Sequence, residues 1–225
     1  MKRVLLYLVF GGMAAAQVAG NANAGYKTQE GRDAVARGLM APDRDQTQHP
    51  REIVEAMEIR PGMTAADIGT GVGYMLPYLS QAVGKDGSVI GEDIAPDFIE
   101  KAKVRARTMN LTNIRFILGT DHDPKLPGDS VDRALVLDTY HHFDYPEAML
   151  KSIRDSLMTD GRLYIVDYYK NEEAMPGGRA LQHIRLDRDD VIREVQSNGF
   201  RLLSKHDQVP GKQYMLVFER TRNPE

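Results

Sequence analysis

The sequence predicts an α/β fold, a three-layer sandwich in which helices cover both faces of a mostly parallel sheet. Two observations predict it. Short apolar segments alternate with amphipathic helical segments along most of the chain. A glycine-rich turn follows the first apolar segment, as in α/β sheets that bind nucleotides. The size agrees, because 225 residues with 42% hydrophobic side chains suit one domain with a substantial core.

Five short apolar segments are expected to form the parallel part of the sheet. The expected strands are 63–68, 88–94, 114–119, 131–137 and 162–166. The segments between them have helical spacing and several begin with a proline, which suits the first turn of a helix. The expected helices begin near Pro50, Tyr74, Pro96, Asp144 and Asp187.

The end of the chain predicts an antiparallel edge. Segments 200–205 and 214–219 are strand-like and are joined by a turn through Pro210-Gly211, which indicates a hairpin. The helix before them opens at Asp187, which resembles a capping box together with Asp190.

The first 24 residues resemble a secretory signal peptide. Lys2-Arg3 is a positive start, residues 4–16 are largely apolar, and Ala22-Asn23-Ala24 has the small-x-small pattern of a cleavage site. The apolar stretch is shorter than the roughly 20 residues that span a bilayer. We therefore expect a cleaved leader, no stable membrane insertion afterwards, and a periplasmic or secreted protein. The alternatives are an uncleaved anchor, or a start at Met40 that would leave the protein in the cytoplasm.

After the leader, residues 25–49 are expected to form a short helix and a loop, and residues 50–220 the main domain. The net charge is −3, so composition gives no indication of a nucleic-acid partner. The chain has no cysteine, which excludes disulfides, thiolate metal sites and cysteine nucleophiles. Composition does not specify an oligomeric state.

The turn after the first strand carries three glycines at alternate positions, Gly69, Gly71 and Gly73. A strand, a glycine turn and a helix N-terminus form the usual cradle for a nucleotide, because glycine accepts positive φ and lets the backbone approach a ligand. A dinucleotide fingerprint would have a small residue where Tyr74 stands. The spacing therefore favours a cofactor with a single nucleoside.

Two acidic residues follow the next strands. Asp93 ends the second strand, 20 residues after Gly73, where an acid accepts hydrogen bonds from ribose hydroxyls; alternatively it caps the next helix. Its neighbour Glu92 should point to the other face of the sheet. Asp121 follows the third strand and could hold an adenine amino group, or it is a solvated loop acid like the nearby Asp123.

Candidate catalytic residues follow the fourth strand, in the segment from Asp138 to Phe143. It contains Tyr140, His141 and His142 at the expected mouth of the sheet. A histidine there could act as a general base or orient a substrate. The alternative is that one histidine caps a helix and the other packs beneath the loop.

The histidines do not predict a metal site. His122, His141, His142 and His183 lack the usual ligand spacings, and adjacent histidines rarely bind one ion. The segment Gly177-Gly178-Arg179, with His183 and Arg185, is expected to be a long flexible loop near the same crevice that could act as a lid. Its arginine and histidine side chains could bind an anionic substrate group or be solvated.

Taken together, these residues resemble the class I S-adenosylmethionine-dependent methyltransferases. The resemblance rests on Asp-x-Gly-x-Gly-x-Gly at 67–73, on Asp93 and on Gly119-Thr120-Asp121. It is closest to a bacterial group of small stand-alone proteins that share Pro42-Asp43-Arg44-Asp45, the stretch Leu118 to Pro124, and Asp138 to Phe143.

The resemblance implies a Rossmann-like sheet of seven strands whose last strand is antiparallel. It also implies S-adenosyl-L-methionine as cofactor, with the glycines near its methionine part, Asp93 near the ribose and Asp121 near the adenine. The expected cofactor-binding residues are Asp67, Gly69, Gly71, Gly73, Asp93, Ile94, Thr120, Asp121 and Asp138.

The expected activity is methyl transfer to a small-molecule acceptor. The segment after the fourth strand departs from the Asp/Asn-Pro-Pro-Tyr of methyltransferases that modify nucleic-acid amino groups. Two alternatives stay open: a protein of the same fold that binds the cofactor or its demethylated product without turnover, and a nicotinamide-dependent oxidoreductase. Tyr74 and the glycine spacing disfavour the second.

Overall fold

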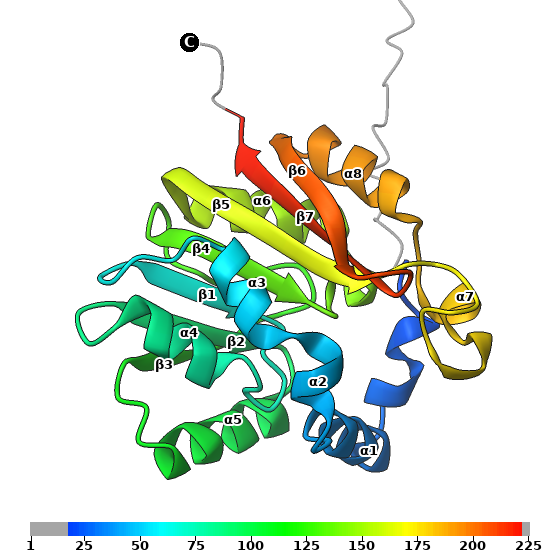
Figure 1. The fold of residues 1–225 in the computed structure, drawn as a ribbon, viewed down its shortest axis with the longest axis horizontal. Helices are drawn as coiled ribbons and strands as arrows, with labels where there is room; N and C mark the ends of the chain where they lie inside the picture. The colour runs from blue at the N-terminus through cyan, green and yellow to red at the C-terminus, as the bar shows by residue number, and fades with distance from the viewer. Residues whose placement is uncertain (1–17, 222–225) are drawn as a thin grey trace, which may run out of the picture.

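A seven-stranded sheet forms the middle layer of the protein (Figure 1). The computed structural model describes residues 18–221. The strands follow the order β3-β2-β1-β4-β5-β7-β6, and only β7 runs antiparallel to its neighbours. They are β1 (Thr64–Ile68), β2 (Ser88–Asp93), β3 (Ile114–Leu118), β4 (Val131–Leu137), β5 (Leu157–Tyr168), β6 (Phe200–Val209) and β7 (Gln213–Arg220). The predicted fold class is confirmed.

Helices cover both faces of this sheet (Figure 1). One face packs against α3 (Pro50–Ala56), α4 (Leu76–Val83) and α5 (Pro96–Thr108). The other packs against α6 (Pro146–Ser156) and α8 (Arg188–Ser197). Apolar side chains from each layer meet in two separate cores, so the sheet is buried on both sides, as parallel strands require.

The predicted strands agree with the structure to within one residue in the first half of the chain. β5 begins at Leu157 rather than at 162, because the register shifts between Val131 and Arg133 and pairs the earlier residues with the start of β4. The predicted capping box is wrong. Asp187 stands at the N-cap of α8, but its side chain accepts no hydrogen bond from the helix.

The N-terminal segment packs beside the sheet rather than on either of its faces. It contains the short η1 (Ala22–Tyr26), α1 (Gln29–Leu39) and α2 (Arg44–Gln48), which lie near α5 and α7 (Ala180–His183) in Figure 1. Residues 1–17 of the predicted leader lie outside the described residues. Within residues 18–221, no helix combines the length and the apolar character needed to cross a membrane.

A buried leucine of α4 tests the packing of this helix against the sheet. Leu79 is fully buried, whereas Leu203 on β6 is 37% exposed. We expect Leu79→Ala to lower the free energy of unfolding by about 2–5 kcal/mol, because the substitution leaves a cavity. Leu203→Ala, which leaves no cavity, should cost about 0.5 kcal/mol or less. Urea unfolding followed by circular dichroism measures both, and equal losses would contradict the packing.

Candidate functional site

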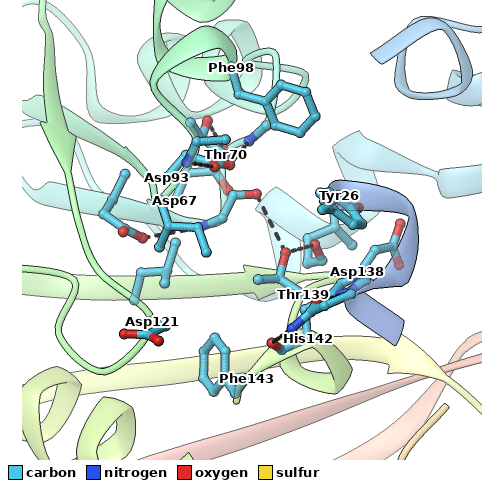
Figure 2. Close-up of a pocket in the computed structure, with 18 of the residues that line it drawn as sticks. Tyr26, Asp67, Thr70, Asp93, Phe98, Asp121, Asp138, Thr139, His142 and Phe143 are labelled. Atoms are coloured by element: carbon cyan, nitrogen blue, oxygen red, sulfur yellow. Dashed lines mark hydrogen bonds between the residues drawn. The ribbon is translucent and has the colours of Figure 1, made fainter. Parts of the chain in front are cut away.

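The site lies at the carboxyl ends of the parallel strands. The chain passes from β1 outward to β2 and β3 and then returns to β4 on the other side of β1. The connections that leave the paired strands β1 and β4 therefore run in opposite directions. Such a switch point leaves a crevice in which α/β proteins bind ligands. A cavity of about 520 Å³ opens there, within the usual size range of ligand sites (Figure 2).

The glycine turn has the predicted backbone conformation. Gly69 has a φ of 72° and Gly73 one of 83°, values that strain other residues. Gly69 lines the cavity, but a Cβ on it would lie 2.3 Å from Cγ2 of Thr139. Gly73 is not part of the lining; a Cβ there would meet Leu76 and Ala102. This glycine allows α5 to pack against the turn, and its contact with a cofactor stays a prediction.

Side chains at the end of β2 hold the glycine turn in place. Asp93 lines the cavity and accepts hydrogen bonds from the backbone N–H of Gly71 and of Ala95, both at 2.8 Å. It thus holds the residue at the N-cap of α5 as well as facing the cavity, and ribose binding stays a prediction. A carboxylate has four lone pairs, which leaves acceptor capacity for a ligand. Burial raises the pKa of Asp93 to about 6.

Glu92 also reaches the cavity, although strand alternation predicted that it points away. Its Oε2 accepts the N–H of Gly69 at 3.3 Å, because the turn folds back over the end of β2. Its Oε1 is buried and has no hydrogen-bond partner among the described residues. Burial raises the pKa of Glu92 well above its usual value.

Asp67 lies near the end of β1, just before the turn. Its Oδ2 accepts a hydrogen bond of 2.6 Å from the hydroxyl of Thr70, and both residues line the cavity. Burial raises the pKa of Asp67 to about 6. Figure 2 shows Asp67, Thr70 and Asp93 grouped on one side of the cavity and His142 and Thr139 on the other.

The loop after β3 forms the rim. Thr120 and Asp121 of this loop line the cavity. Ile94, which follows β2 and is 53% exposed, lines it as well. The Asp121 carboxylate lies 2.6 Å from Nδ1 of His122. These residues occupy the places that the sequence predicts for binding the nucleoside part of a cofactor.

Asp138 lines the cavity in a strained backbone conformation, with a φ of 51°. Gln213 donates to its Oδ1 at 2.6 Å, and Arg44 lies 3.4 Å from its Oδ2. Burial raises the pKa of Asp138 to about 6, although the Arg44 guanidinium opposes the shift. The predicted residue is thus at the site, with both oxygens already bound by the protein.

Residues before the sheet help to close the cavity, and no pattern in the sequence predicts a role for them. Arg44 lies 4.0 Å above the ring of Tyr74, whose hydroxyl donates to Asp45. Tyr26 of η1 and Phe98 of α5 add aromatic walls, with ring centroids 6.1 Å apart. The only signal in the sequence was the segment Pro42 to Asp45, which the family resemblance included without assigning a function.

The three predicted catalytic residues separate in the structure. His142 lines the cavity, with its Nδ1 2.8 Å from Oδ1 of Asn23. His141 is buried behind it, with its Nδ1 2.7 Å from Asp167. Tyr140 lies in the core and donates to Glu194. Because Tyr140 does not reach the cavity lining, we assign no catalytic role to it.

The predicted loop at 177–185 brings a third histidine to this place. His183 packs with its ring centroid 4.9 Å from that of His141 and 5.4 Å from that of His142. Burial lowers the pKa of His183 to about 4 and that of His142 well below its usual value. Arg185 is instead paired with Glu194, so it does not bind an anionic substrate group as expected.

Comparisons with known proteins agree with this geometry. Residues 59–213 match a family model described as a methyltransferase domain, which is more than half of the chain. The chain belongs to the methyltransferase-domain family. The nicotinamide alternative is therefore set aside, and S-adenosylmethionine is the cofactor that the family assigns to the cavity.

Individual relatives resemble parts of this methyltransferase-domain protein. An uncharacterized 37.1 kDa protein in transposon TN4556 of Streptomyces fradiae is 36% identical over 49% of this chain and 32% of its own length. The aklanonic acid methyltransferase DauC of Streptomyces sp. (strain C5) is 35% identical over 50% of this chain and 51% of its own. The matches thus span about a third to a half of these curated relatives.

A solved structure resembles more of the chain. The SAM-dependent methyltransferase from Aquifex aeolicus superposes with a TM-score of 0.75, at 23% identity, over 82% of this chain and 96% of its own. At this identity the likeness supports the fold alone.

The residues present fit S-adenosylmethionine. The cavity offers carboxylates for an amino group and ribose hydroxyls. Glu92 is part of its lining, and the buried Oε1 of this residue has no hydrogen-bond partner in the described part of the chain. Asp67, Asp93 and Asp138 also supply negative charge for a cationic sulfonium. In this fit Asp67 would hold the methionine part, Asp93 the ribose, and Thr120 with Asp121 the adenine.

The raised pKa values predict pH-dependent cofactor binding. Asp93 has a pKa of about 6, and only its ionised form is a full acceptor for ribose hydroxyls. Affinity should therefore rise with pH through 6, by about tenfold between pH 5 and pH 7 for this one carboxyl. Calorimetric titration with S-adenosylmethionine at pH 5, 6 and 7 measures it.

Asp93→Asn should bind more weakly at pH 7 and show a shallower pH dependence than the wild type. The exposed Asp86 in the turn before β2 gives the matched control, Asp86→Asn. An affinity of the wild type that does not change between pH 5 and pH 7 would contradict the prediction.

Proposed function

We propose that the protein transfers a methyl group from S-adenosyl-L-methionine to a small-molecule acceptor. The observation that carries the proposal is one continuous cavity with two chemically different ends. Acidic residues of the turn and of β2 line one end, and His142 lines the other. A cofactor site and a neighbouring acceptor site are what a transfer reaction requires.

The bound cofactor supplies an electrophilic methyl group on a positively charged sulfur. The remaining task of the protein is to orient the acceptor and to exclude water. Tyr26 and Phe143 give apolar walls next to His142, with the rings of Tyr26 and His142 4.8 Å apart. An acceptor that must lose a proton would give it up at this end of the cavity.

Two features support a small acceptor. The cavity is closed on one side by α1 and α2, with Leu39 and Arg44 in its lining, which leaves limited space for a large substrate. The net charge of −3 gives no indication of a nucleic-acid substrate. DauC, whose name gives aklanonic acid as its substrate, is one relative that acts on a small molecule.

The histidine at the acceptor end provides the test. The affinity of His142→Ala for S-adenosylmethionine should stay within about threefold of that of the wild type, because the acidic residues at the other end of the cavity are unchanged. It should lose about 10²–10⁴-fold in turnover, as expected when an acid–base group is removed. Calorimetry measures binding, and release of S-adenosylhomocysteine across a panel of hydroxyl, amine and thiol acceptors measures turnover.

His206→Ala is the matched control, since His206 lies exposed on β6. Full turnover by His142→Ala would contradict the acceptor site. Cofactor binding by the wild type without product from any acceptor would instead favour the alternative, a protein that binds the cofactor without turnover.

We also propose that a leader is removed and that the mature protein acts outside the cytoplasm, but with a cleavage site earlier than Ala24. The N–H of Ala19 donates to Asp144 at 3.2 Å, and Asn23 bonds to His142. Cleavage after Ala24 would remove these contacts from the acceptor end. The triplet Ala14-Ala15-Ala16 has the same small-x-small pattern and precedes them.

The proposal predicts that the mature protein begins at Gln17. Intact-mass measurement and N-terminal sequencing of the protein from the periplasm of its native host identify the first residue. A chain that begins at Gly25 would contradict the earlier cleavage site. A protein that retains Met1, or that begins at Met40 and is found in the cytoplasm, would contradict export.

A further inference from the structure

Three histidines from distant parts of the chain converge beside the cavity. His141 and His142 belong to η2 (Tyr140–His142), directly after β4, and His183 ends α7. One ligand atom from each of the three imidazoles lies within 4.8 Å of the others. Figure 2 shows His142 at the cavity, and the rings of His141 and His183 pack against that of His142. The geometry points to a binding site for one divalent transition-metal ion, held by His141, His142 and His183.

The hydrogen bonds of His141 orient it as a metal ligand. Its Nδ1 lies 2.7 Å from Oδ1 of Asp167, and its backbone N–H donates to Oδ2 of the same carboxylate at 3.0 Å. The carboxylate therefore accepts a hydrogen bond from Nδ1–H of His141. The lone pair of Nε2 then remains available for a metal ion. A carboxylate behind a histidine is the usual outer support of a metal site, and it supplies negative charge near the ion.

His142 is oriented in the same way by an amide. Its Nδ1 lies 2.8 Å from Oδ1 of Asn23. The Asn23 amide cannot be reversed, because its Nδ2 donates to the backbone oxygen of His142 and to Asp144, both at 3.0 Å. The amide oxygen thus accepts a hydrogen bond from Nδ1–H of His142, and Nε2 is again the atom that is free to bind a metal ion.

His183 is the adjustable member of the set. It is half-buried at the end of the four-residue α7, and its ring has no hydrogen-bond partner among residues 18–221. A tetrahedral zinc site with bonds of 2.0–2.1 Å needs ligand nitrogens about 3.3 Å apart. The ligand nitrogens lie within 4.8 Å of one another, so metal binding draws the rings together by up to about 1.5 Å, mainly by movement of His183.

The ligand set selects the class of ion. Three imidazoles without a carboxylate in direct contact suit Zn²⁺, Co²⁺, Ni²⁺ or Cu²⁺ rather than Mg²⁺ or Ca²⁺. Three protein ligands leave a position for a further group, as in catalytic metal sites. If the proposed methyl transfer is correct, on which this role rests, a bound ion would occupy Nε2 of His142. The ion rather than the free imidazole would then bind the acceptor oxygen or sulfur and ease the loss of its proton to solvent.

The test measures metal binding apart from cofactor binding. The full chain is purified without a polyhistidine tag, stripped with a chelator and titrated with Zn²⁺ by calorimetry and with Co²⁺ by visible absorption. We expect one ion per chain and the intense absorption bands of four-coordinate Co²⁺. His183→Ala should abolish both signals. Asp167→Asn should weaken binding by about 10–100-fold, as removal of outer support does elsewhere.

Controls separate this site from folding and from the proposed function. His206→Ala should bind Zn²⁺ like the wild type, and far-ultraviolet circular dichroism should show that His183→Ala is folded. His183→Gln provides a second folded variant that lacks the imidazole. Less than half an ion per chain, or Zn²⁺ binding unchanged in both His183 variants, would overturn the site.

Titration with S-adenosylmethionine completes the design, because His183 does not line the cavity. Binding of Zn²⁺ by a protein that does not bind S-adenosylmethionine would support the metal site and contradict the proposed function. Cofactor binding by a protein that takes up no metal would contradict the metal site and leave the proposed function standing.

Discussion

Two carboxylates at the end of β2 hold the turn on which the site depends. Glu92 accepts the N–H of Gly69 and Asp93 accepts that of Gly71, so consecutive residues of one strand fix alternate residues of the turn. Asp93 also accepts the N–H of Ala95 and so sets where α5 begins. The pairing of β1 with β2 places both acids beneath the turn. The position of the cavity follows from this one arrangement.

The acceptor end is built differently, from residues that the sheet alone does not provide. Asn23 precedes the main domain, His142 follows β4, and His183 lies on α7. They meet because η1 packs beside η2 and α7 closes over both. A protein with the same sheet but another N-terminal segment would keep the cofactor end of the cavity and lack this acceptor end. We therefore expect substrate specificity to reside in residues 18–49 and in α7.

The charges of the two ends suit different partners. Burial raises the pKa values of Asp67, Asp93 and Asp138 to about 6, so these carboxyls are mostly ionised at pH 7 and become protonated just below it. A cationic ligand would favour their ionised forms, so ligand binding and ionisation support each other. At the other end, the low pKa values of His142 and His183 leave both rings neutral at pH 7. Neutral imidazoles can accept a proton or bind a metal ion.

The layers of the fold, the turn at 67–73 and the acids after the strands can be predicted from the order of residues alone. These features are local, because alternating hydrophobic segments and glycine at positive φ constrain neighbouring residues wherever the chain folds. The folded chain was needed to show that Tyr140 lies in the core, that Glu92 supports the turn and that His183 joins His141 and His142. Those positions depend on contacts between residues far apart in the chain, which spacing along the sequence does not encode.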